Sequence, residues 1–466
     1  MALPIHGLRY AKGVIDNWIK YYVRDNGMTS YRAEELAQSG RMLTIFALYT
    51  SYTGDVDFML GHFDKAKVLA EWLLYRYAMS VTNWPASDPR HGVVAGGDEG
   101  DGFVAFYETY GKTPLSHAYS CTSNTYRGFT EIGQMWRQIG HATGRKDVSA
   151  HADKLLDAAP RVLDALQASL NKTTQPTTNP RAPICVPSNA DPSPAGSPAG
   201  GCLGDFRGYN ELMYTGALTY EQADNMFIHL TYGNESVLVT RPMTLGATGY
   251  NNKQVTYTAY GMAYGLLQHD MVERFLLHYF GMSAHTYTRA TWTTPEAAHP
   301  DRDVGSTDYV AAGVHTAPTY MKWMLLFEEP NTKTVWVGKA LPRDWLGPGV
   351  EPVVVNNATT RYGRVSYTMS ADAHAHAAAD TAATTASYAV TVSVSLPGTF
   401  AGPAGPAGGV RVRVRTPLEH VGKMSAVMVG GKPWAKFDAR AETIDFAELT
   451  PALLEEMKTI VVTFKA

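Results

Sequence analysis

The sequence DVSAHADKLLDAAPRVLDALQASL, residues 147–170, places apolar side chains three and four residues apart. This spacing puts them on one face of a helix and predicts an amphipathic α-helix. The members of that face are Leu155, Leu156, Ala159, Val162, Leu163, Leu166 and Leu170. Residues 124–142 form a second helical segment, and the turn at 144–147 begins with a glycine, at which helices commonly end. The two segments are therefore predicted to form a helical hairpin.

Helical patterns extend over the first 330 residues. Further helices are predicted at about 8–22, 32–52, 56–79, 219–231, 255–268, 270–282 and 307–328. Long connections separate them at about 81–123, 171–218 and 283–306, and connections of such length are usually functional or disordered. We expect the tract 171–201, rich in Pro, Thr, Asn, Ser and Gly, to be a flexible excursion. The other two carry aromatic and carboxylate side chains, and we expect them to be ordered.

The pattern changes after Pro330 to short β-branched segments separated by Gly- and Pro-rich turns. Residues 410–415, VRVRVR, alternate strictly, which predicts a strand with one apolar and one basic face. The predicted strands are 334–337, 364–369, 388–396, 410–415, 426–429, 443–446 and 459–464, with a mobile hairpin tip at 371–386. The sequence therefore predicts an α+β multidomain protein, with a helical domain at 1–330 and a small antiparallel β-sandwich at 331–466.

Composition limits the function. Of 466 residues, 45% are apolar and 18% are charged, so the chain can bury a large core. There are 40 Lys and Arg against 43 Asp and Glu, for a net charge of −3, which argues against a nucleic-acid partner or an anionic membrane surface. No apolar run approaches the roughly 18–20 residues of a membrane span. We expect neither a metal nor a cofactor, because the sequence contains none of the usual motifs for binding them.

Three features concern the compartment. N-glycosylation acceptors occur at Asn171, Asn234 and Asn357. Cys185 and Cys202 bracket a Pro-, Gly- and Ser-rich loop, and a disulfide between them would close about 18 residues and stabilise the fold by roughly 3 kcal/mol. Cys121 would remain a buried thiol. We expect a secreted, vacuolar or lysosomal protein, although residues 1–9 lack the apolar stretch of a signal peptide, as a truncated N-terminus would.

Serial helical hairpins followed by a small β-sandwich are the arrangement of an (α/α) toroid with an appended sheet domain. Five stretches carry a more specific likeness: Tyr260–Asp270, Phe275–Tyr279, Thr291–Glu296, Trp336–Trp345 and Ala358–Tyr367. They resemble six-hairpin glycosidases, most closely the α-L-rhamnosidase-like branch, in which a Leu-Pro-x-x-Trp link joins toroid to sandwich. The resemblance covers roughly residues 1–465. It implies an (α/α)6 toroid without the N-terminal β domain of full members.

A cluster of acids lies in the first long connection. Residues 96–102, GGDEGDG, hold Asp98, Glu99 and Asp101 among glycines that permit a tight exposed turn. Repulsion among three carboxylates raises at least one pKa, as a general acid working near neutrality requires. The resemblance implies the acid at Glu99, or at Asp98, and Trp84 and His91 are candidate substrate contacts nearby. The alternatives are a solvated acidic turn and a Ca²⁺ loop.

A second candidate stretch, Trp292–Glu296, lies in the third long connection. The resemblance implies that Glu296 is the catalytic base, because a carboxylate that follows a Trp at the end of this loop has that role in the family. Trp292 is then a candidate for stacking on a sugar. Alternatively, Glu296 is a helix-start acid that the helix dipole stabilises, with Pro295 in the first turn.

The stretch 205–211, DFRGYNE, offers further sugar contacts. Arg207 can pair with a uronate carboxylate, and Tyr209 can stack on a sugar ring. The alternative is a loop anchored by an Arg–Asp pair.

Three functions remain open. The leading hypothesis is an inverting glycoside hydrolase for an oligo- or polysaccharide, with two carboxylates roughly 6.5–9.5 Å apart. The first alternative is a polysaccharide lyase on the same toroid, with Tyr119, His117, Asn124 and Arg207 as candidates for taking the proton and neutralising the uronate. The second is a non-catalytic protein that binds glycans or assembles with other chains. The sequence names no sugar, linkage or oligomeric state.

Overall fold

A computed structural model describes residues 5–29, 36–96, 116–191, 206–232, 249–250, 253–255, 259–288, 290–298, 310–372 and 388–465. The chain forms two compact units. The helical unit consists of Ile5–His269 and Leu277–Ala317, and the sheet unit contains Asp270–Leu276 and Pro318–Ala466. The sheet unit thus takes in residues 270–276 and 318–330, which the sequence analysis assigned to the first domain. The change from helices to sheets does not fall at a single point in the chain.

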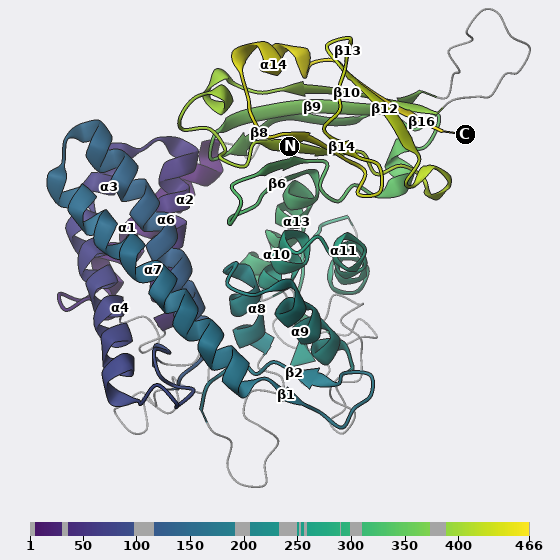
Figure 1. The fold of residues 1–466 in the computed structure, drawn as a ribbon. Helices are drawn as coiled ribbons and strands as arrows, with labels where there is room; N and C mark the ends of the chain where they lie inside the picture. Colours follow the sequence, from purple (N-terminus) through teal and green to yellow (C-terminus); the bar gives the residue numbers. More distant parts are fainter. Residues whose placement is uncertain are drawn as a thin grey trace, which may run out of the picture. The chain divides into compact units, whose positions relative to one another are not determined.

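Helices dominate the chain up to Leu325 (Figure 1). They are α1 (Ile5–Tyr22), α2 (Leu36–Thr53), α3 (Val56–Gly61), α4 (Phe63–Asn83), α6 (Tyr119–Thr143), α7 (Lys146–Thr173), α8 (Phe206–Tyr214), α9 (Tyr220–Tyr232), α10 (Tyr260–Gln268), α11 (Val272–Thr286), α12 (Ala311–Val314) and α13 (Thr316–Leu325). Of these, α11 and α13 each have residues in both units. Short strands are β1 (Gln175–Pro176), β2 (Ile184–Cys185), β3 (Gly249–Tyr250), β4 (Lys253–Val255) and β5 (Ala297–Ala298). In the part of the chain that is described, no helix is long and apolar enough to span a membrane.

The predicted hairpin of residues 124–170 is confirmed. α6 ends at Gly144, whose φ of 71° is a left-handed conformation that glycine adopts without strain, and α7 begins at Lys146. The predicted helix at 56–79 is two helices instead, because His62 interrupts it between α3 and α4. α8 lies in a segment that the sequence analysis treated as a loop.

The prediction of a flexible excursion at 171–201 is wrong for its first half. β1 pairs with β2, β2 lies against α9, and Ala182 and Val186 are buried. Cys185 is buried and disulfide-bonded, and Cys121 is a buried free thiol. Cys202 lies outside the described residues. Small apolar side chains therefore fix this segment, in spite of its loop-like composition.

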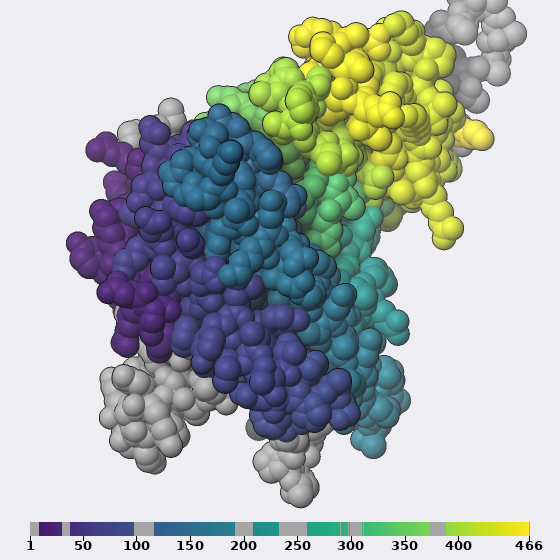
Figure 2. Space-filling model, turned by 60° about the vertical axis from the view of Figure 1, so that its left-hand side comes forward, coloured from purple at the N-terminus to yellow at the C-terminus, as the bar shows by residue number. Residues whose placement is uncertain are grey.

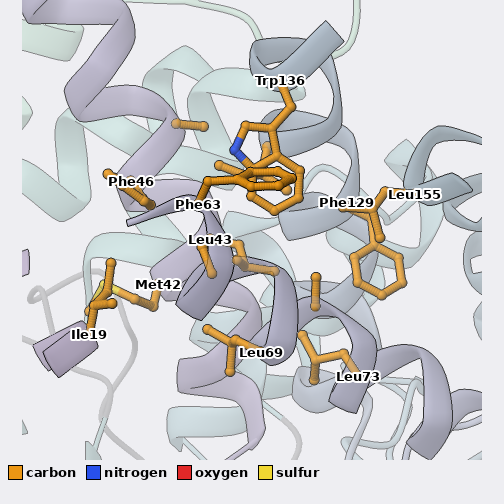
Figure 3. Packing of buried hydrophobic residues seen from close by; sticks show 14 of the residues in the cluster. Ile19, Met42, Leu43, Phe46, Phe63, Leu69, Leu73, Phe129, Trp136 and Leu155 are labelled. Atoms are coloured by element: carbon orange, nitrogen blue, oxygen red, sulfur yellow. The ribbon is translucent and has the colours of Figure 1, made fainter. Parts of the chain in front are cut away.

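An extensive apolar core joins α1, α2, α4, α6 and α7 (Figure 3). At its centre Phe63 and Trp136 meet edge to face, with ring centroids 5.0 Å apart. Leu43, Leu69 and Leu155 pack into the same cluster, and each such buried side chain contributes roughly 1.5–3 kcal/mol. The segments from α1 to α7, purple to blue in Figure 2, form the outer face of this core, where α4 touches both α1 and α7.

Two helix crossings in this unit have no room for a side chain. A Cβ on Gly40 of α2 would lie 2.4 Å from the carbonyl oxygen of Asn124 in α6, and one on Gly128 would lie 2.5 Å from the carbonyl oxygen of Gly40. A Cβ on Gly261 of α10 would lie 1.7 Å from the carbonyl oxygen of Asn210 in α8. The glycines therefore let α2 touch α6, and α10 touch α8, backbone to backbone.

Replacing Gly40 with Ala should lower the free energy of unfolding by about 1–3 kcal/mol, because the added methyl group meets backbone that cannot turn aside. Gly13 is the matched control, since it lies inside α1 with no atom within 4 Å of its Cβ position. Gly13→Ala should leave stability unchanged or raise it by about 0.5–1 kcal/mol. Urea unfolding followed by circular dichroism measures both variants, and equal stabilities would contradict the close crossing.

His151 of α7 is a titratable group inside the apolar core. Its ring centroid lies 5.4 Å from that of Trp136 and 6.4 Å from that of Phe63, and its Nδ1 lies 3.3 Å from Oε1 of Glu71. Burial lowers the pKa of His151 to about 4, against the opposing effect of Glu71. The usual pKa of near 6.5 applies in the unfolded chain. The unfolded state thus binds more protons below pH 6.5, so stability falls as the pH falls from there towards 4.

We expect the wild-type protein to lose about 3 kcal/mol of stability through His151 between pH 7.5 and pH 4, and His151→Gln to be spared that loss. Chemical unfolding at the two pH values measures the difference. His141, exposed near the end of α6, is the control, and His141→Gln should lose as much stability as the wild type. If His151→Gln also behaves like the wild type, His151 is not the group responsible.

The sheet unit contains a six-stranded sheet of order β13-β12-β16-β10-β9-β8 and a five-stranded sheet of order β14-β15-β11-β7-β6 (Figure 1). The strands are β6 (Leu326–Glu328), β7 (Val335–Val337), β8 (Val353–Thr360), β9 (Gly363–Asp372), β10 (Ala389–Ser395), β11 (Val410–Arg413), β12 (Met424–Val429), β13 (Lys432–Pro433), β14 (Phe437–Asp438), β15 (Thr443–Phe446) and β16 (Ile460–Phe464), and α14 is Pro451–Glu456. Val392 of β10 and Val412 of β11 belong to one buried cluster. The two sheets therefore share a core.

One detail of this unit differs from the predictions. β11 runs parallel to β7, and β8, β9 and β10 of the other sheet lie between the two strands in the chain.

The predicted basic face at 410–415 carries two buried side chains, Arg413 and Arg415. Arg413 makes two contacts of 2.7 Å with the carboxylate of Asp270, and Arg415 makes one of 2.7 Å with Glu273. The unit thus neutralises its buried guanidinium groups with its own carboxylates.

Candidate functional site

Four helices of the helical unit meet at one buried carboxylate, that of Glu211. Arg41, Asn124 and Glu211 are each the sixth residue of their helix, in α2, α6 and α8, and Tyr260 is the first residue of α10. Arg41 forms an ion pair with Glu211, and the hydroxyl of Tyr260 donates to the same carboxylate oxygen. Nδ2 of Asn124 donates to the other oxygen at 3.1 Å. We call these four residues the Glu211 cluster.

A second arginine lies beside this cluster. The guanidinium carbon of Arg127 is 4.1 Å from the ring centroid of Tyr214 and 5.0 Å from that of Tyr264, and Nη2 donates to the Tyr264 hydroxyl at 3.3 Å. Arg127 also lies 4.0 Å from the carboxylate of Glu131, one helical turn further along α6. The buried side chains therefore hold two cations and two anions in contact. Pairing of this kind offsets the large cost of taking charges out of water.

The charges of the cluster differ in their exposure. Glu211 is nearly inaccessible, whereas the side chain of Arg41 is 23% exposed and lies over the ring of Tyr260 at 4.7 Å. The cluster is thus a rigid polar floor with one guanidinium partly open to solvent. In the described residues, no group of His, Cys, Asp and Glu could hold a metal ion.

The predicted acids Asp98, Glu99 and Asp101 lie outside the described residues. The two ends of their loop are described, and they are fastened together. The amide of Gly96 donates to the carbonyl of Ser116, and the amide of Ser116 donates to that of Gly96, both at 2.9 Å. Ser116 precedes the first residue of α6 by three positions. The acidic loop therefore leaves and rejoins the helical unit at the N-terminal end of α6.

Trp84 and His91, predicted as substrate contacts, lie at the base of this loop with His117. The indole Nε1 of Trp84 donates to Nε2 of His117 at 3.1 Å, and Nδ1 of His117 lies 2.7 Å from Oδ1 of Asp191. An Nε2 that accepts and an Nδ1 that donates define the neutral Nδ1–H tautomer. Burial raises the pKa of Asp191, but the hydrogen bonds from His117 outweigh it and the pKa is lowered. Nδ1 of His91 lies 2.7 Å from the carbonyl of Trp84.

One face of Trp84 is not free for a sugar, because the guanidinium of Arg90 lies 3.4 Å from its ring centroid. Arg90 is itself held by two contacts with Asp88, which lower the pKa of that carboxyl to about 2. This group of side chains anchors the loop ends, and only the other face of Trp84 can serve as a stacking surface.

Trp292 is the exposed tip of a tight turn. The residue is 54% exposed. Its backbone φ of 53° is left-handed, a conformation that costs a non-glycine residue roughly 1–2 kcal/mol. Two backbone hydrogen bonds close the turn. The amide of Thr288 donates to the carbonyl of Thr293 at 2.8 Å, and the amide of Trp292 donates to the carbonyl of Thr288 at 3.1 Å. A strained turn that displays an indole to solvent is typical of a binding surface.

Glu296 is not a helix-start acid, because the two residues after it, Ala297 and Ala298, form strand β5. It is half-buried and directly precedes Ala297, which pairs with Val255 of β4. Val255 lies five residues before Tyr260, so the chain limits their separation to roughly 17 Å. Glu296 is therefore tied to the segment that enters α10, whose first residue contacts Glu211.

Two predicted substrate contacts are corrected. Tyr209 is fully buried, and its hydroxyl donates to the carbonyl of Val186 at 3.0 Å, so the ring has no face for a sugar. Tyr119 is also fully buried, with its hydroxyl on Ser169 and Thr173, and burial raises its pKa to about 12. Neither ring has a face open to a ligand. Arg207 lies in α8, and its side chain is outside the described part of the chain.

The sequence analysis missed Arg41, Glu211 and Tyr260 as partners. Two signals were present, since Glu211 ends the stretch 205–211 and Tyr260 opens one of the family-like stretches. Arg41 lies far away in sequence, and only the crossing of α2 over α6 brings it near. A single sequence gives no sign of that crossing.

Glu211→Gln should lower the free energy of unfolding by about 3 kcal/mol, because the amide keeps the shape but leaves the charge of Arg41 uncompensated. Asp157→Asn is the control, since Asp157 and Arg161 form an exposed pair on α7 that is worth less than about 1 kcal/mol. Thermal and urea unfolding of both variants measure the difference. A Glu211→Gln protein as stable as the control would show that the ion pair is not formed.

Comparison with known proteins gives only distant likenesses. No family model matches the chain, and no curated protein matches it. Among solved structures, an α-L-rhamnosidase from Dictyoglumus thermophilum aligns at 10% identity and a TM-score of 0.42, over 98% of this chain and 44% of that one. A GH78 family rhamnosidase of Bacillus sp. GL1 aligns at 11% and 0.40, over 78% and 34%. A sialidase aligns at 13% and 0.44, over 77% and 32%. The chain spans less than half the length of each.

Proposed function

We propose that the chain is a glycoside hydrolase that acts on an oligo- or polysaccharide by inversion. Glu99, or its neighbour Asp98 or Asp101, is the general acid, and Glu296 is the base that activates water. The proposal includes an (α/α)6 toroid for the helical unit and a β-sandwich for the sheet unit, in the manner of the α-L-rhamnosidase-like branch.

One observation carries the proposal: both acid-bearing loops join the helical unit at helices that build the Glu211 cluster. The loop with Glu99 is closed by Gly96 and Ser116 just before α6, which supplies Asn124. The segment with Glu296 pairs with the strand that leads into α10, which supplies Tyr260. Glycoside hydrolysis requires two carboxylates at one place, and these two attachments support such an arrangement.

The remaining side chains suit the same reaction. Trp292, four residues before Glu296, offers an open indole on which the apolar face of a sugar can stack. The Glu211 cluster does not provide the acid or the base, because its carboxylate is already bound by a guanidinium, a hydroxyl and an amide. It serves to hold α2, α6, α8 and α10 together.

A polysaccharide lyase has less support. A lyase base must reach the proton next to the uronate carboxylate, and Tyr119 is buried and hard to ionise. Both ring nitrogens of His117 are occupied, by Trp84 and by Asp191. Asn124 is committed to Glu211. Three of the four lyase candidates are therefore engaged in holding the structure, and the side chain of the fourth, Arg207, is outside the described part of the chain.

Glu99→Gln and Glu296→Gln should each reduce kcat for sugar release by roughly 10²–10⁴-fold, because each removes one proton-transfer group. The assay is release of reducing sugar from a broad glycan panel, with NMR of the fresh product to read its anomeric configuration. Glu221→Gln, an exposed carboxylate in the first turn of α9, is the matched control and should keep full activity.

Four outcomes are informative. Loss of activity in both variants with an inverted product supports the proposal. Full activity in both rejects the site, and an ultraviolet-absorbing unsaturated product from a uronic-acid polymer identifies a lyase. If the parent binds glycans through Trp292 but releases nothing from any of them, the protein is a glycan-binding protein.

A further inference from the structure

The edges of the two sheets are unequal. Among the described strands, the outer members of the sheets are β13, β8, β14 and β6. Three of these are short, with two residues in β13, two in β14 and three in β6, and β13 also consists of Lys and Pro, which hinder pairing with another chain. β8 has eight residues. It is the one long edge in the described sheets.

The sequence of β8 makes this edge a liability. It reads VVVNNATT, which is β-branched, uncharged and free of Pro and Gly. Segments of this kind pair readily with strands of other molecules when an edge is open. Val354 is 52% exposed, and Asn356 and Asn357 beside it are exposed as well. The fold therefore presents an aggregation-prone strand at its surface.

A bulge interrupts the edge at Asn357. The register between β8 and β9 shifts between Val355 and Ala358, and Asn357 has a φ of 55°. Its amide donates to Oγ of Ser366 at 2.8 Å, and its carbonyl accepts from Arg364 at 3.2 Å. The backbone of Asn357 is thus fixed, while no hydrogen bond of its side-chain amide is found among the described residues. A bulge of this kind re-aims one side chain away from the sheet.

Asn357 is also the first residue of an Asn-Ala-Thr acceptor for N-glycosylation, and Cys185 is disulfide-bonded. Disulfides form and persist in oxidising compartments, which include the one where N-glycans are added. We propose that Asn357 carries an N-linked oligosaccharide that covers the free edge of β8. The donor is a lipid-linked oligosaccharide diphosphate. The sugar C1–O bond to the diphosphate breaks, a C1–N bond to Nδ2 forms, and the amide proton leaves with the diphosphate.

The test uses the full chain secreted from a yeast host, and mass spectrometry of the peptide that contains Asn357. We expect this peptide to carry a glycan, and Asn357→Gln to lose it. Two variants are matched controls. Asn356→Gln changes the exposed neighbour outside the acceptor, and Thr359→Ser keeps both the acceptor and a hydroxyl for the 2.6 Å hydrogen bond from Arg364.

The protective role is measured separately, by light scattering at rising protein concentration. Asn357→Gln should aggregate several-fold faster than Asn356→Gln and Thr359→Ser, with little change in Tm. Adding Val354→Lys to Asn357→Gln should restore solubility, because a charge on an edge strand blocks pairing. An unmodified Asn357 in secreted protein whose Cys185 is oxidised would overturn the proposal. A glycan whose loss leaves aggregation unchanged would overturn its protective role, and neither result bears on the catalytic proposal.

Discussion

The contact of backbone with backbone at Gly40 and Gly261 is the constraint on which the helical unit depends. A side chain larger than hydrogen would push α2 away from α6, or α10 away from α8, by more than an ångström, because the nearest atoms belong to the main chain. Arg41 follows Gly40 directly, and Asn124 supplies the carbonyl oxygen that Gly40 faces. Tyr260 precedes Gly261 directly. The hydrogen bonds to Glu211 form only at the separation that the glycines allow. Close packing therefore comes first, and the polar cluster follows from it.

Buried charge then gives the packing its specificity. Replacing a buried ion pair with apolar side chains of similar volume often leaves the stability of a protein unchanged or raises it. Apolar side chains could therefore fill the space around Glu211 without loss of stability. They would not fix which helix faces which. A carboxylate that needs a guanidinium, a hydroxyl and an amide, each from a different helix, is satisfied in one arrangement only. The four helices are thereby held in one arrangement.

Periodicity predicted the elements with regular patterns and failed where structure depends on neighbours. The hairpin of residues 124–170 was predictable because its apolar face repeats over many turns. α8 was missed because nine residues with a glycine show too little of the period. β8 was missed because VVVNNATT does not alternate, since its bulge shifts the register halfway. In the site, Trp292 was predictable as an aromatic residue in a long loop, whereas Tyr209 in an equally polar stretch is buried. Sequence alone does not distinguish these two environments.

The core also bears on how the protein responds to acid. Folded His151 takes up its proton only near pH 4, so at pH 5 the folded state is about 2 kcal/mol less favoured through this residue than at neutrality. A domain has only about 5–15 kcal/mol of stability in total, and 2 kcal/mol is a substantial part of it. The packing of Phe63 and Trp136 around the imidazole ring therefore costs the core part of its stability in acid.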